Sequence, residues 1–299
     1  MRSLGALIKR NTKLFFKDKG MFFTSLITPA ILLVLYATFL AGIYRDSFVA
    51  SIPQGVVIPS EVIDGCVGGQ LFASLLAVSC ITVSFCSNFL MVQDKVTGAR
   101  SDLTMTPVKK TTLAMGYYVS TLISTLIVCV VAVGACFIYL AFKGWYLTAL
   151  DILLIFIDIF LLVMFGTALS SIINHFLTSQ GQISAVGSIV SAGYGFICGA
   201  YMPISQFGSG LQTALSFLPG TYGTALLKNH ALRGAFAEML DLGIPKEAVE
   251  GMKAGIDCSF EWLGHEVSVG AMYAVLIVSV LVLVGVYVAI HVFEKRKKK

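Results

Sequence analysis

Long apolar stretches recur along the chain and alternate with shorter polar segments. A helix needs about 20 mostly apolar residues to cross the hydrocarbon core of a bilayer. The pattern therefore predicts an all-α, polytopic membrane protein with six transmembrane helices in a single transmembrane domain over residues 1–299. The six predicted spans are Met21–Tyr44, Val67–Val92, Leu113–Phe142, Ile152–Ile173, Ile183–Met202 and Val267–Ile290.

The fifth predicted span is the least apolar of the six because serines and glycines interrupt it. Gly195 and Gly199 form a GxxxG step within it, and small residues at this spacing let two helices approach closely or let one helix bend. In the first span Pro29 predicts another bend, because nearby hydroxyl side chains can satisfy the carbonyl that proline leaves without a donor.

Composition agrees with a membrane location. The chain is 57% hydrophobic and 12% charged, whereas soluble globular domains carry about 25% charged residues. Five of the seven cysteines lie in apolar stretches, and no Cys or His spacing indicates a metal site. Cys66 and Cys258 fall in predicted external segments, where they either pair or remain two separate thiols.

Basic residues are unevenly distributed among the segments that join the spans. Fifteen of the 21 lysines and arginines lie before the first span, between the second and third spans, or after the sixth. Cytoplasmic segments of membrane proteins carry this excess of Lys and Arg. We therefore expect a multi-pass protein of a cell membrane with both termini in the cytoplasm.

The residues before the first span predict an amphipathic helix within residues 2–19. On a helical wheel Lys9, Arg10, Lys13 and Lys17 share one face, and the apolar residues share the opposite face. Such a helix lies in the membrane interface with its lysines toward anionic headgroups. It can be a simple anchor or a lever that also touches a cytoplasmic partner, and the pattern favours neither.

A polar loop, residues 93–112, joins the second and third spans, and its charges are nearly balanced in sign. The sequence predicts a short helix over Ala99–Met105, which Pro107 ends. Thr106 as N-cap and Pro107 as first helical residue also predict the start of the helix that contains the third span.

The external segment 203–266, between the fifth and sixth spans, is too polar to cross a membrane. Gln206–Leu218 and Thr221–Leu232 have apolar character without spanning length, and Pro219-Gly220 separates them. We expect two short re-entrant or surface-lying external helices there, followed by a small polar cap over residues 234–266.

Several short motifs follow one another in a fixed order. Gly98-Ala-Arg100 and Leu103-Thr-Met-Thr-Pro107 follow the second span, Gly199-Ala-Tyr-Met-Pro203 ends the fifth, and Phe217-Leu-Pro219-Gly-Thr-Tyr222 comes next. Together with the basic leader, this order resembles the membrane subunit, or permease, of type-2 ATP-binding-cassette (ABC) exporters. The resemblance covers nearly the whole chain, and the order of the motifs carries it rather than any single motif.

The resemblance implies that the loop between the second and third spans forms a coupling helix in contact with a separate ATPase subunit. The residues implied in that contact are Lys95, Gly98, Arg100, Asp102, Leu103 and Pro107. It also implies that the first, second and fifth spans line a dimer seam and the substrate route. The candidates for that route or seam are Pro29, Asn88, Asp158, Gly195, Gly199 and Pro203.

The sequence contains no G-x-x-x-x-G-K-[ST] motif, so the chain cannot bind ATP through a P-loop. We therefore expect a transport subunit rather than an enzyme, with no cofactor of its own and with ATP and Mg on the partner ATPase. The resemblance further implies a homodimer or a heterodimer with a sibling permease, contact with membrane lipids, and no nucleic-acid partner. The expected cargo is hydrophobic or amphipathic (a drug, as in multidrug export, a lipid or an antimicrobial peptide), and the expected location is a bacterial plasma membrane.

Asp158 lies within the fourth predicted span, where a carboxylate is costly and therefore suggests a function. It supports an alternative, an ion- or proton-coupled secondary transporter. A hydrogen-bonded Asp158 packed against another span is the simpler interpretation, because ATP-driven export needs no proton relay. A membrane enzyme is a third alternative, but the few His, Asp and Glu residues are dispersed rather than clustered.

Overall fold

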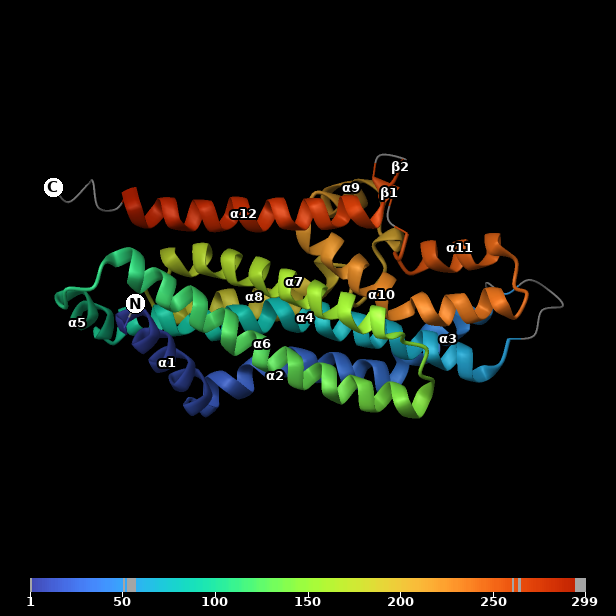
Figure 1. Ribbon diagram of the computed structural model, residues 1–299, viewed down its shortest axis with the longest axis horizontal. Helices are drawn as coiled ribbons and strands as arrows, with labels where there is room; N and C mark the ends of the chain where they lie inside the picture. Colours follow the sequence, from blue (N-terminus) through green and yellow to red (C-terminus); the bar gives the residue numbers. More distant parts are fainter. Residues whose placement is uncertain (1, 51, 53–57, 260, 263–264, 294–299) are drawn as a thin grey trace.

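The computed structural model describes residues 2–50, 52, 58–259, 261–262 and 265–293. Its long helices run along one axis of an elongated bundle (Figure 1). Within the described residues the only strands are β1 (Glu261–Trp262) and β2 (His265–Glu266), which form one antiparallel pair. The prediction of an all-α membrane protein is confirmed. The basic residues that follow the sixth predicted span lie outside the described residues.

Five helical segments in the described part of the chain are long and apolar enough to cross a membrane, and they overlap the first, second, third, fourth and sixth predicted spans. The first consists of α2 (Lys19–Leu35), the π-helical turn η1 (Tyr36–Leu40) and most of α3 (Ala41–Ala50). The others are α4 (Ser60–Val96), α6 (Lys110–Lys143), α7 (Ala149–Phe176) and α12 (Val269–Phe293).

The fifth predicted span is not among these five. It corresponds to α8 (Gln180–Ile197), which starts at a capping box between Ser179 and Gln182. The helix stops well before Met202 because Gly199 adopts a left-handed conformation, with φ +71°. Length and composition therefore do not confirm the predicted total of six spans. In the bundle, α8 nevertheless returns the chain from the end where α7 finishes (Figure 1).

The central helix is α4. With 37 residues it is the longest of the described helices. It packs against α2, α6, α7, α8 and α10. Leu76 and Ile81 are fully buried, and every residue in its most apolar stretch is buried as well. A helix that is apolar on all sides needs neighbours on all sides, so α4 forms the axis of the fold.

The helices α1 (Arg2–Lys17) and α5 (Ala99–Met105) lie at the same end of the bundle as the last turns of α12 (Figure 1). We call this the α5 end. The predicted extents of the leader and of the short helix agree with the structure. The predicted start of the third span's helix is wrong, because α6 begins at Lys110 and the Thr106 hydroxyl instead donates to the Leu103 carbonyl of α5.

The segment after α8 lies toward the opposite end, which we call the α11 end. It comprises η2 (Ile204–Gln206), α9 (Ser209–Ser216), α10 (Pro219–Asp241) and α11 (Lys246–Gly255). The predicted break at Pro219 is confirmed, since this residue is the first of α10. The expectation of a second short helix is wrong. The helix α10 continues to Asp241, because its second half also packs into the protein, with Phe236 and Met239 buried. Lys228 is buried too, and its ammonium donates to the carbonyls of Gly199 and Ile256, at 2.9 Å each.

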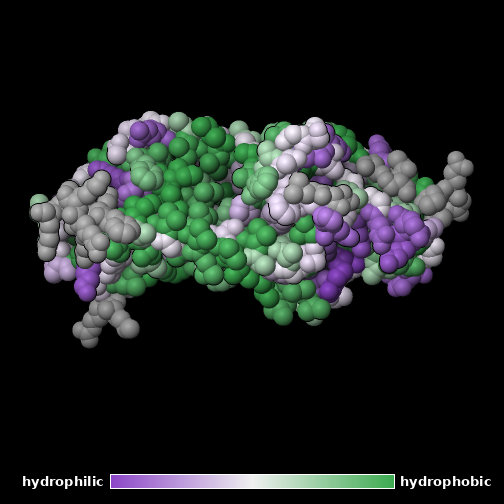
Figure 2. Space-filling model, turned by 90° about the horizontal axis from the view of Figure 1, so that it is seen from above, coloured by the Kyte–Doolittle hydropathy of each residue, from purple (hydrophilic) through white to green (hydrophobic). Residues whose placement is uncertain are grey.

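The polarity of the surface changes along the long axis of the bundle. Hydrophobic residues cover a broad zone of the face seen in Figure 2, and hydrophilic residues gather most densely toward the α11 end. Exposed apolar side chains are frequent on α2 and α12, among them Phe23 at 62% and Leu281 at 66% exposure. These two helices therefore offer apolar surface to lipid or to another chain. All seven cysteines, including Cys66 and Cys258, are buried free thiols.

Candidate functional site

The α5 helix is set off from α4 by a single glycine. The first turn after Val96 places Gly98 in the left-handed region, with φ +83°, a conformation that costs other residues free energy. Leu103 then packs against a cluster that contains Leu7 and Tyr117. The opposite side of α5 is open, and Met105 is 87% exposed.

The exposed side of α5 is short and polar. Ser101, Asp102 and Thr104 are exposed beside Met105, and Pro107 is exposed in the extended link to α6. Of the implied ATPase-contact residues, Asp102 and Pro107 are therefore exposed in this region, whereas Gly98 and Arg100 are half-buried. Leu103 holds the helix to the bundle.

Lys95 has a different environment from the others. Its ammonium donates to the carbonyls of Asn174, His175 and Leu177 at the end of α7. A cation at a helix C-terminus satisfies carbonyls that have no intrahelical donor and favours the helix dipole. In this chain Lys95 therefore connects the end of α4 to the end of α7.

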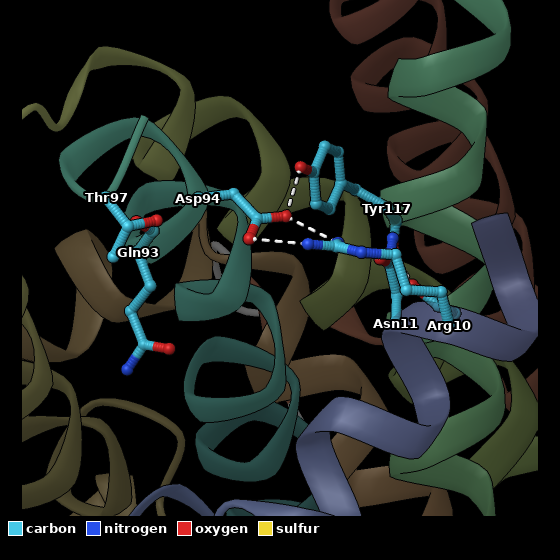
Figure 3. A network of polar contacts seen from close by, with 7 residues as sticks. Arg10, Asn11, Gln93, Asp94, Thr97 and Tyr117 are labelled. Carbon is cyan, nitrogen blue, oxygen red and sulfur yellow. Dashed lines mark hydrogen bonds and ion pairs between the residues drawn. The ribbon is translucent and has the colours of Figure 1, made fainter. Parts of the chain in front are cut away.

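An ion pair joins the leader helix α1 to the last turn of α4, shortly before α5 begins (Figure 3). The Arg10 guanidinium donates to both oxygens of Asp94, at 2.7 and 3.0 Å, and the Tyr117 hydroxyl donates to the same carboxylate at 2.6 Å. Hydrogen bonding to Asp94 raises the pKa of Arg10 above its usual range. The contact joins α1, α4 and α6 two residues before α4 ends.

Part of the apolar face of the leader helix α1 is buried against the rest of the protein. Leu7 and Phe15 are buried, and Gly116 of α6 lies so close to Leu7 that an added methyl group would be 3.0 Å from its Cβ. Lys9, Lys13 and Lys17 are exposed, whereas Arg10 turns inward to Asp94. The apolar face that the sequence assigns to the membrane interface therefore packs partly against α6 and α4.

Two cavities follow α8 along its length. The first, of about 560 Å³, lies at the α5 end between α2, α4 and α8, with Thr24, Phe89 and Gly187 among its lining residues. The second, of about 510 Å³, lies farther along between the α2–α3 segment and α8, and Ser191 lines both. The first and fifth predicted spans thus border a discontinuous groove, with part of α4 as its floor.

Three of the candidate route residues lie at the far end of this groove. Pro203 lines the second cavity. Gly195 lies beneath Tyr201, whose ring is only 2.3 Å from where an added Cβ would be, and Gly199 supplies the left-handed turn. The GxxxG step therefore ends α8 and lets the chain fold back on it. The atoms nearest to its two glycines belong to Tyr201 and Ile204, which follow α8 in the chain.

The remaining route candidates lie in the bundle interior. Pro29 lines a third, apolar cavity of about 720 Å³ between α2, α4 and α6. Asn88 is buried and its amide donates to the hydroxyls of Ser170 and Ser171 on α7, at 3.1 and 2.9 Å. Asn88 therefore joins α4 to α7. It is not exposed at the membrane interface, although its position near the end of a span would allow that.

Asp158 is fully buried and hydrogen-bonded on both carboxylate oxygens. One oxygen is 2.6 Å from Nδ1 of His230 on α10, and the other accepts from the Tyr273 hydroxyl of α12, also at 2.6 Å. The sequence predicts a hydrogen-bonded Asp158 but not its partners, although an intramembrane carboxylate signals that partners exist. Asp158 lines none of the cavities described above. Within the described residues, no group of three His, Cys, Asp or Glu could hold a metal.

The sequence was also compared with known proteins. The profile of the ABC-2 family transporter proteins matches residues 62–290, whereas no curated protein matches the chain. The matched region begins near the start of α4 and extends into α12, so it includes α5, α8 and the Asp158 contacts.

Proposed function

This chain belongs to the ABC-2 family of transporter proteins, and we propose that it is the transmembrane half of an ATP-driven exporter. It is a membrane component of an ABC-2 transporter, and the family implies an ATPase partner. Because the chain has no P-loop motif, ATP hydrolysis belongs to a separate ATPase subunit.

The observation that carries the proposal is the position of α5. This seven-residue helix lies at the end of the bundle, with an exposed outer side and an anchored inner side. A force on its outer side passes to α4 through Gly98 and to α1 through the Arg10–Asp94 pair. Closure of the ATPase subunits would thereby move the central helix of the permease.

The path of the chain supports six crossings with both termini in the cytoplasm. The five long apolar helices alone would leave the termini on opposite sides of a membrane, yet α1 and the end of α12 lie at the same end of the bundle (Figure 1). The helix α8 supplies the missing crossing, with its polar residues facing the groove or a second chain rather than lipid. The excess of basic residues then puts the α5 end in the cytoplasm.

The groove along α8 supports a hydrophobic or amphipathic cargo moved outward. The lining of its second cavity is almost entirely apolar, with Ile31, Phe39 and Phe196 among its side chains. On the neighbouring surface, Ile27 of α2 and Ile189 of α8 are 51% and 70% exposed. A second permease chain, identical or a sibling, would cover this surface and close the groove into a route.

The proposal is tested by co-purifying the full-length permease with its candidate ATPase. Asp102→Lys and Met105→Asp alter the exposed side of α5 without touching its anchor Leu103, so both should reduce complex formation and ATP turnover. Lys246→Glu, at an exposed position on α11, is the matched control and should leave both unchanged. Undiminished complex formation by both α5 variants would refute docking at α5.

A further inference from the structure

A separate cavity opens at the α5 end, outside the groove along α8. Its volume is about 740 Å³. It lies among the end of α4, the inner side of α5, the start of α6 and the ends of α7 and α12. Its lining residues include Lys95, Arg100, Lys110, His175 and His291. We call it the basic cavity.

The charged side chains that the structure describes around the basic cavity are all cations. Lys95, Arg100 and Lys110 line it, and none of the described carboxylates does. Asp94 precedes Lys95 on α4, but Arg10 and Tyr117 occupy its oxygens. Within the described residues neither Arg100 nor Lys110 forms an ion pair. Arg100 and Lys110 repel each other, and a bound anion would relieve this repulsion.

The donors around the cavity suit an oxyanion. Arg100 offers a planar fork of N–H groups that matches phosphate oxygens, and Lys110 offers a second cation at the N-terminus of α6, where the helix dipole also favours negative charge. Lys95 also lines the cavity, but its ammonium donates to the end of α7. The hydroxyls of Ser101 and Thr178 also line the cavity.

The borders of the cavity are apolar where they meet the long helices. Phe176 follows His175 and is 66% exposed, and Val292 follows His291 and is 42% exposed. A charged cavity beside exposed apolar side chains matches the two parts of a phospholipid, a headgroup and its acyl chains. Basic cavities between transmembrane helices recognise anionic headgroups in this way.

We propose that the basic cavity binds a phosphate-bearing anion, supplied either by the headgroup of an anionic phospholipid in the adjacent leaflet or by a soluble phosphate compound. The proposal does not depend on the ATPase partner. Because Arg100 belongs to α5, the bound anion would fix the inner side of this helix against α6 and α7.

The test uses the full-length protein in an uncharged detergent and measures dissociation constants by titration calorimetry. The ligands are dioctanoyl phosphatidylglycerol, its net-neutral phosphatidylcholine analogue and inorganic pyrophosphate. The pocket variant is Arg100→Gln/Lys110→Gln. The control variant, Lys9→Gln/Lys109→Gln, removes the same charge from exposed residues that do not line the cavity.

The expected result is that phosphatidylglycerol binds the wild type and the control alike, and binds the pocket variant about tenfold more weakly or worse. Phosphatidylcholine should bind more weakly than phosphatidylglycerol. Pyrophosphate binding with the same dependence on Arg100 and Lys110 identifies a soluble compound as a sufficient ligand, whereas binding of the lipid alone identifies the headgroup.

The proposal is overturned if no anion binds the wild type, or if the pocket and control variants lose affinity equally. Loss of ATPase co-purification without any anion binding would also overturn it, and would assign the cations to docking of an acidic partner surface. If circular dichroism shows that the double variant is unfolded, Lys110→Gln alone should weaken binding by about fivefold.

Discussion

The guanidinium of Arg10 and the carboxylate of Asp94 form two hydrogen bonds, at 2.7 and 3.0 Å, between residues 84 positions apart in the sequence. Asp94 is 5% exposed, and Tyr117 donates to it as well. The pair joins the leader helix to the segment of α4 that leads into α5. In a transporter driven from this end, it would make α1 and α5 move together.

The Arg10–Asp94 pair should show a measurable coupling free energy. We expect Arg10→Gln and Asp94→Asn each to lower the free energy of unfolding, with a coupling of about 1–2 kcal/mol in the double-mutant cycle. The value is modest because the Arg10 side chain is 32% exposed. Denaturant titration of the purified protein measures it. The matched cycle with Lys13, which is exposed on the same helix, should be additive; equal coupling in both cycles would contradict the account.

Gly195 should tolerate no side chain while Tyr201 lies over it. Gly195→Ala would bring a Cβ to within 2.3 Å of the Tyr201 ring, so we expect a loss of about 1–3 kcal/mol in stability from overpacking. Gly193→Ala is the control, because nothing lies within 4 Å of that position. Tyr201→Ala should reduce the cost of the Gly195 substitution, and an unchanged cost in that background would show that the close approach is not its cause.

Asp158 should matter for stability rather than for energy coupling. Asp158→Ala leaves His230 and Tyr273 without their buried acceptor, and we expect a loss of about 3 kcal/mol. Asp158→Asn keeps an acceptor of the same shape and should cost less. In the assembled transporter Asp158→Asn should retain ATP turnover and export. Stable protein with normal ATP turnover but abolished, proton-dependent transport would instead favour the secondary-transporter alternative.

The sixth crossing can be tested by single cysteines on either side of α8. Ser179 and Ser205 are exposed just before and just after this helix, and the seven native cysteines are buried. A membrane-impermeant maleimide should label Ser205→Cys in intact cells and Ser179→Cys only in inside-out vesicles. Labelling of both positions from one side would contradict a membrane-crossing α8.

Short-range signals in the sequence predict the elements that depend on local chemistry. The α5 helix has the predicted bounds, since polarity and Pro107 determine it within a few residues. The same signals are misleading at Thr106, which can cap the end of one helix as well as the start of the next. Hydropathy locates the five long helices, but α4 begins before Val67 because the bundle buries Val62 and Ile63 as well.

Contacts between distant segments could not be predicted from the pattern. His230 and Lys228 look like residues of a polar external segment, yet each is buried because its partner comes from another element: Asp158 for His230, and the carbonyls of Gly199 and Ile256 for Lys228. The sequence likewise suggests that Lys95 contacts a partner protein, but its ammonium donates to carbonyls at the end of α7. A single sequence shows that burying a charged side chain would cost free energy. It does not show which distant group will form the hydrogen bond or ion pair that offsets this cost.

Site-specific photocrosslinking in native membranes tests the central claim, that an ATPase subunit drives the permease through α5, most directly. A photoreactive phenylalanine analogue replaces Met105 on α5 or, as control, Leu242, which is 44% exposed between α10 and α11. We predict an adduct with the ATPase subunit from position 105 and none from position 242. Absence of the ATPase from the position 105 adducts, or an equal yield from position 242, would contradict the account.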